Sequence, residues 1–145
     1  MKDVVFVIHA GATLFLVGLI WTIQIVHYPL FANVGTEGYA AYQTSHMSRI
    51  TTLVAPVMLI ELGTAAYLAF INYSSSDAKW FWFGFALVVL IWISTVFLQS
   101  PIHGRLAENF DADLVNKLVI SNWIRTFLWT IRGALVLWLV WLKIK

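Results

Sequence analysis

The stretch VVFVIHAGATLFLVGLIWTIQIV, residues 4–26, decides the fold of this chain. Its polar residues are His9, Thr13, Thr22 and Gln24, and a helix of this length crosses the ~30 Å hydrocarbon core of a bilayer. The apolar part is too long for the core of a signal peptide, so we expect it to be retained. Three similar runs follow, and together they predict membrane-spanning helices over about residues 4–28, 46–72, 79–99 and 118–143.

The composition supports a membrane protein. Of the 145 residues, 61% are hydrophobic and 11% are charged, and the mean hydropathy is +0.82. Soluble domains carry about 25% charged residues, and a short soluble chain could not bury this much apolar surface. The net charge of +2 comes without a basic patch, so we expect the lipid bilayer and no nucleic acid as a partner. The absence of cysteine excludes disulfides, thiolate metal sites and Fe–S clusters.

The connections between the apolar runs define the architecture. Residues 74–79 form a short turn, and no helix breaker stands between Tyr39 and Pro56. Asp111 or Asp113 can cap a helix that enters the fourth span, whereas Pro29 is expected to end the first helix. The sequence therefore predicts a single all-α domain, an integral membrane four-helix bundle with up-down-up-down topology. The second and fourth helices should extend beyond the membrane on one side.

The alternation of the spans gathers most of the polar residues at one face of the membrane. The residues concerned are His27, His46, His103, Asn122 and Arg125. Loop and tail cations number three on that side, and four on the side of the termini: Lys2, Lys79, Lys143 and Lys145. This bias favours a cytoplasmic position for both termini, in what we expect to be a bacterial cytoplasmic membrane.

Each helix carries one polar stripe at a similar depth. The stripes are Gln24, His27 and Tyr28; Tyr42, His46 and Arg49; Thr95, Gln99 and His103; and Asn122, Arg125, Thr126 and Trp129. Polar groups in lipid normally face the bundle interior, so the four stripes predict one shared site. Four tryptophans lie close enough to line an aromatic pocket there: Trp21, Trp92, Trp123 and Trp129.

Several chemistries fit this set of residues. Three histidines, His27, His46 and His103, suffice for a transition metal such as Cu, Fe or Zn, with one position left open. Two histidines on facing helices could instead hold a haem, and Gln24 is a further cofactor-binding candidate. The catalytic candidates are Arg125, Asn122 and Tyr28, of which Arg125 and Asn122 would orient an oxygen or carry anionic charge. The site would bind a cofactor or carry out oxygenase-type redox chemistry on a small apolar or quinone-like ligand.

A non-enzymatic function is the alternative. The polar residues would then be hydrogen bonds between helices in a lipid-binding or small-molecule-binding protein, or in an assembly subunit. His27 and His46 could also lie at the headgroup level, His103 in an ordinary loop, and Arg125 could reach the interface. The sequence leaves open whether the protein is an enzyme and whether it forms a homo-oligomer.

Two charges lie deep in the spans. Arg132 requires a partner, and Glu61 is the expected one because both stand in the middle third of their helices, either as a structural tie or in a functional role. His9 is about 27 Å from His27 along the helix axis, so it cannot join the same site. It could instead hydrogen-bond Glu61.

Two stretches near the C-terminus carry a family resemblance. SPIHGRLAEN (100–109) and SNWIRTFLW (121–129) resemble the anthrone-oxygenase-like family of small four-helix membrane proteins. In that family a Pro-x-Asn-x-x-Leu stretch ends the third helix, and a Trp/Asn-x-x-Arg-Thr stretch opens the fourth. The matching positions here are Pro101, Leu106, Asn122, Arg125 and Thr126.

The resemblance implies the four-helix layout and oxygenation of polycyclic phenols without a required metal. His103 stands where that family usually has Asn, which makes a metal site more plausible here. HYPLF (27–31) and HMSRI (46–50) also resemble a subgroup of bacterial membrane proteins.

Overall fold

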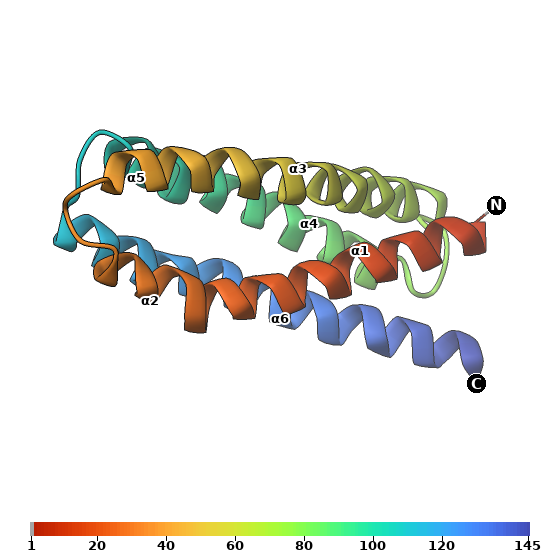
Figure 1. The fold of residues 1–145 in the computed structure, drawn as a ribbon. Coiled ribbons are helices and arrows are strands. Elements are labelled where there is room, and N and C mark those ends of the chain that lie inside the picture. Colours follow the sequence, from red (N-terminus) through yellow and green to blue (C-terminus); the bar gives the residue numbers. More distant parts are fainter. Residues whose placement is uncertain (1) are drawn as a thin grey trace.

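Four long helices lie side by side in the computed structural model, which describes residues 2–145 (Figure 1). The first runs from Lys2 to Asn33 as α1 (Lys2–Thr22), the π-turn η1 (Ile23–His27), α2 (Tyr28–Leu30) and the short η2 (Phe31–Asn33). The second is α3 (Tyr39–Ile71). The third combines α4 (Ala78–Ser94), the π-turn η3 (Thr95–Gln99) and α5 (Ser100–Leu106), and the fourth is α6 (Ala112–Ile144). All four are long and apolar enough to cross a membrane, which confirms the predicted helical spans.

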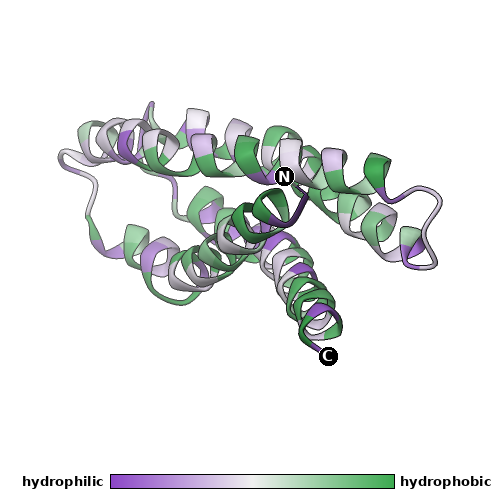
Figure 2. Cartoon of the chain, turned by 90° about the vertical axis from the view of Figure 1, so that its right-hand side faces the viewer, coloured by the Kyte–Doolittle hydropathy of each residue, from purple (hydrophilic) through white to green (hydrophobic). Residues whose placement is uncertain are grey.

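The helices form a square arrangement. α1 packs against α3 and α6, and α4 packs against the same two helices, so α1 and α4 lie on a diagonal. Both termini lie at one end of the molecule, the right-hand end in Figure 1. Large apolar side chains point outward, for example Val7 and Phe97, which are 68% and 71% exposed. Apolar residues extend along every helix in Figure 2, as a lipid-facing surface requires.

Neither of the two prolines near the site ends its helix. Pro29 lies in α2 and Pro101 in α5, and each is the second residue after a π-turn. In these turns the backbone N–H of Tyr28 donates to the carbonyl of Ile23, and that of Ser100 to the carbonyl of Thr95. The wider turn takes up one extra residue, and we attribute to it the relief of the clash between a proline ring and the preceding turn. The prediction that Pro29 ends the first helix is therefore wrong.

The starts of α3 and α6 follow the sequence. α3 begins after Gly38, whose φ of 75° suits glycine, and it continues past Pro56 to Ile71 without interruption. α6 begins after Asp111, whose side chain accepts a hydrogen bond from the backbone N–H of Leu114 at 3.0 Å. Asp111 is thus the cap among the two candidates.

Candidate functional site

A buried knot of amides joins η1 to α6. The side-chain oxygen of Gln24 accepts hydrogen bonds from Asn122 Nδ2 at 2.8 Å and Thr126 Oγ1 at 3.2 Å. Its nitrogen donates to the backbone carbonyl of Val119 at 3.1 Å. Gln24, Asn122 and Thr126 are at most 2% exposed. Because their polar atoms are engaged between helices, they hold the two helices in register.

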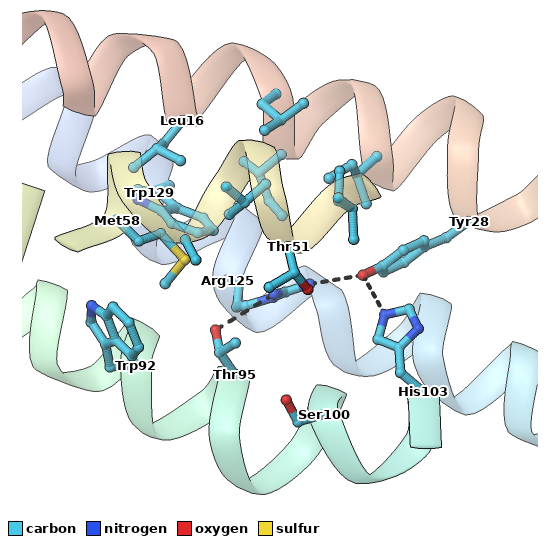
Figure 3. A pocket seen from close by; sticks show the side chains of 16 residues that line it. Leu16, Tyr28, Thr51, Met58, Trp92, Thr95, Ser100, His103, Arg125 and Trp129 are labelled. Carbon is cyan, nitrogen blue, oxygen red and sulfur yellow. Dashed lines mark hydrogen bonds between the residues drawn. The ribbon is translucent and has the colours of Figure 1, made fainter. Parts of the chain in front are cut away.

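A chain of hydrogen bonds leads from this knot across the bundle. Arg125 donates through Nε to Asn122 Oδ1 at 2.9 Å and through Nη2 to the same oxygen. Nη2 also donates to the Tyr28 hydroxyl at 3.2 Å. The same hydroxyl lies 2.8 Å from His103 Nε2 (Figure 3). The other ring nitrogen of His103 is 2.7 Å from Gln43 Nε2. All four long helices therefore meet at this chain.

The remaining two histidines contact each other. His27 Nε2 and His46 Nδ1 are 2.9 Å apart, and the ring centroids of His46 and His103 are 5.5 Å apart. His46 Nε2 is buried without a hydrogen-bond partner. Within residues 2–145, no three His, Cys, Asp or Glu side chains are grouped so that they could hold a metal ion.

A cavity of about 200 Å³ opens beside this chain of hydrogen bonds. Its walls are mostly apolar and come from all four long helices, and the wall residues include Leu16, Ile20, Ile23, Val54, Met58, Trp92 and Trp129. One end is polar, where Tyr28, His103 and Arg125 line it together with Thr95 (Figure 3). An apolar cavity with a few convergent polar groups at one end is the usual form of a small-molecule site.

A second polar cluster lies deeper in the bundle. Glu61 of α3 and Arg132 of α6 form an ion pair at 2.8 Å, with both side chains 1% exposed. Glu61 also accepts hydrogen bonds from Thr13 Oγ1 at 2.9 Å and from Trp129 Nε1 at 3.1 Å. The pair confirms the partner expected for Arg132. Since Trp129 also lines the cavity, this cluster fixes one of the cavity walls.

His9 belongs to this deeper cluster, in a different contact from the expected one. Its Nε2 accepts from Arg132 Nη2 at 2.7 Å, because a guanidinium can only donate. A neutral His9 then carries its proton on Nδ1, which lies 2.7 Å from Thr64 Oγ1. Arg132 Nη1 donates to the backbone carbonyl of Gly84 at 2.6 Å. The expected hydrogen bond between His9 and Glu61 is therefore wrong, because Arg132 lies between the two.

The structure brings the sequence-predicted site residues together, but divides them between three settings. Tyr28, His103 and Arg125 line the cavity. Gln24 and Asn122 lie in the amide knot behind it, and His27 and His46 line a separate open groove on the outside of the bundle. The three proposed metal ligands are therefore neighbours, while only His103 reaches the cavity. Their assignment as metal or cofactor ligands stays a prediction.

Some polar residues were missed and others misassigned. Gln43 is fully buried against His103, whereas Arg49, from the expected stripe, is exposed. Gln43 could have been found because it stands three residues before His46 and so shares its helix face.

His103 lies on the helix α5 and not in a loop. Of the four tryptophans, Trp92 and Trp129 line the cavity, whereas Trp21 and Trp123 pack edge to face outside it, with ring centroids 5.8 Å apart.

Comparison of the chain with protein-family models, with curated proteins and with solved structures finds no match. The function is therefore inferred from the chemistry of the site.

Proposed function

We propose that this integral membrane protein binds a small aromatic ligand with an oxygen head group, quinone-like or phenolic, in the cavity. The observation that carries the proposal is the cavity itself, with apolar walls and one polar end at Tyr28, His103 and Arg125. An apolar body would lie against Trp92 and Trp129, while the ligand oxygen would accept from Arg125 or exchange hydrogen bonds with Tyr28 and His103.

The size of the cavity limits the ligand. An engineered apolar cavity of ~150 Å³ binds benzene, so a cavity of about 200 Å³ suits a single substituted ring. Two residues of its lining, Thr51 on α3 and Ser100 on α5, are exposed, and they mark a mouth between these helices. Both helices belong to candidate membrane spans, so the ligand would enter from the bilayer.

Oxygenation of a bound phenol by O₂ is the enzymatic form of this proposal: one oxygen atom of O₂ would enter the ring to give a quinone, and the other would leave as water with two hydrogens of the phenol. It is the type of activity that the family resemblance implies. The resemblance rests on Pro101, Leu106, Asn122, Arg125 and Thr126. Tyr28 and His103, 2.8 Å apart at the cavity wall, would hold or move the phenolic proton. The polycyclic phenols of that family exceed the single ring that the cavity suits, so a smaller substrate is favoured here.

A metal bound by the three histidines is the second candidate function, and it requires these side chains to rearrange, because residues 2–145 hold no group of three such side chains placed to bind a metal. It is favoured by the unpartnered Nε2 of buried His46, which is free to act as a ligand, and by the neighbouring rings of His27 and His103. A haem fits less well, because His27 and His46 are hydrogen-bonded to each other, and no space for a porphyrin ring remains between the two imidazoles. Metal analysis and a visible spectrum of protein purified without chelators test this candidate, and protein without metal or absorbance excludes it.

We propose an up-down-up-down path through a bacterial cytoplasmic membrane, with both termini in the cytoplasm. The first turns of α3 and α6, before about residue 46 and residue 118, would extend beyond the lipid on the opposite side. The supporting observations are the position of both termini at one end of the bundle and the polar residues near the start of both helices, such as Glu37, Asp111 and Lys117. Homo-oligomers are compatible with this arrangement.

Calorimetric titration of the protein in lipid nanodiscs with phenol and with 1,4-benzoquinone tests ligand binding. Ala55→Phe fills the cavity wall and should abolish binding, whereas the control Ala41→Phe changes an exposed alanine of the same helix and should leave it intact. Equal binding by both variants, or none by the unaltered protein, would refute the proposal. Oxygen consumption in the presence of a bound phenol tests the enzymatic form.

A further inference from the structure

Arg125 is a buried cation without an acidic partner. It is 7% exposed, and within residues 2–145 the ion pairs closer than 4 Å are Glu61–Arg132 and Asp3–Lys143. The partners of Arg125 are neutral: Asn122, Tyr28 and Thr95. Arg132, which also lies in the bundle interior, pairs with the carboxylate of Glu61. Arg125 differs from Arg132 because it has no such carboxylate.

An unpaired charge in a bundle interior is costly, and it normally marks a functional site. A guanidinium has five N–H donors, of which Arg125 uses Nε and both Nη2 hydrogens on Asn122 and Tyr28. Nη1 has only a long contact of 3.5 Å to Thr95 Oγ1, so its donors remain largely available. Because Arg125 lines the cavity, those donors and the positive charge act on whatever occupies it.

Among residues 2–145, no Asp or Glu lines the cavity. Beside Asn122 of its own helix, the polar groups that line the cavity with Arg125 come from the other three long helices, and they are the Tyr28 hydroxyl, His103, Thr51, Thr95 and Ser100. None of them supplies a fixed negative charge. An acidic partner for Arg125 would therefore be a ligand, and the cavity that Arg125 lines is the space open to it.

We propose that the ligand of this cavity is an anion, a single aromatic ring that carries a carboxylate or phenolate oxygen bound by Arg125. The proposal rests on the proposed function and specifies the charge of the ligand. The ring lies between the apolar walls, and the oxygen anion replaces the missing acidic partner of Arg125. Neutral quinones and phenols of the same shape bind more weakly, because they leave the guanidinium uncompensated.

Matched pairs of probes test this proposal by titration calorimetry in nanodiscs of neutral lipid. One pair is benzoate and benzamide, and the other is 4-nitrophenolate and 4-nitroaniline; within each pair the shape is nearly conserved and the charge differs. We expect the anion to bind roughly ten- to a hundredfold more tightly than its neutral partner, the range of a charged hydrogen bond. A preference confined to one pair would identify the carboxylate or the phenolate as the recognised group.

The variant Arg125→Gln keeps hydrogen-bonding capacity and removes the charge, so it should bring the affinities for the anion and for its neutral partner close together. Arg125→Lys retains the charge and should keep part of the preference. The control Arg49→Gln removes an exposed arginine outside the cavity and should change nothing. Far-ultraviolet circular dichroism and the thermal transition of each variant check that it folds.

The outcomes separate this proposal from the proposed function. Equal affinity of the unaltered protein for anionic and neutral probes overturns the anionic ligand and leaves the ligand-binding cavity standing. This comparison needs no variant, so it holds even where Arg125→Gln fails to fold. Absence of binding for all four probes overturns both. An anion preference that Arg49→Gln removes as fully as Arg125→Gln also overturns the assignment to Arg125.

Discussion

Replacement of Glu61 by leucine should strongly destabilise the bundle. Glu61 and Arg132 are each 1% exposed, and the variant Glu61→Leu leaves the guanidinium buried with no carboxylate. Loss of one partner of a buried ion pair costs about 3–5 kcal/mol of unfolding free energy. The hydrogen bonds from Thr13 and Trp129 to Glu61 are lost too. Bonds between membrane helices average ~0.6 kcal/mol, so these two add about 1 kcal/mol, and the charge dominates the effect.

The double variant Glu61→Leu/Arg132→Met separates charge from packing. It removes both charges together, so its unfolding free energy should lie closer to that of the unaltered protein than either single variant does. Reversible unfolding in mixed micelles, followed by circular dichroism, measures all four proteins of the cycle. A loss of only about 1 kcal/mol for Glu61→Leu, or additive losses in the double variant, would refute the role of the ion pair.

Three further predictions concern neighbouring contacts. Gly84→Val should lower the unfolding free energy by about 1–3 kcal/mol, because even a Cβ at Gly84 would lie 3.0 Å from Arg132 Nη1. Gly63→Val is the control in the same unfolding assay, since a Cβ at Gly63 would point into open space. Asn122→Leu should cost about 1–3 kcal/mol in that assay, since Gln24 and Arg125 lose a buried partner; an unchanged midpoint would contradict the amide knot. Gln43→Leu should weaken phenol binding about fivefold by releasing His103, as measured by calorimetry, and unaltered affinity would show that His103 needs no such support.

The sequence predicts the four spans well because each depends on a local property, the length of an apolar run. It also predicts that Glu61 pairs with Arg132, since two opposite charges at matching depth in the spans have few other partners within the membrane. The gathering of Tyr28, His103 and Arg125 follows from the same reasoning about depth.

Other features depend on packing between helices and cannot be obtained from local patterns. The cavity exists because side chains from four helices fail to fill one volume, which no single stretch encodes. The helices continue through Pro29 and Pro101, each with a π-turn just before it, and α3 continues through Pro56 without one, whereas proline in a sequence indicates only a break. The choice of Gln43 over Arg49 as the inward residue depends on how α3 is rotated against its neighbours.

The π-turns have a consequence for insertions and deletions. Each turn holds one residue more than an α-helical path requires, so η1 and η3 each contain a spare residue. A deletion within either turn can be absorbed by a return to α-helix, which keeps the orientation of the flanking segments but restores the clash of Pro29 or Pro101 with the preceding turn. The same deletion in α1 or α4 would rotate everything beyond it by roughly 100° and turn Tyr28 or His103 away from the cavity. The first and third long helices thus tolerate a deletion only at the π-turns, next to the candidate site.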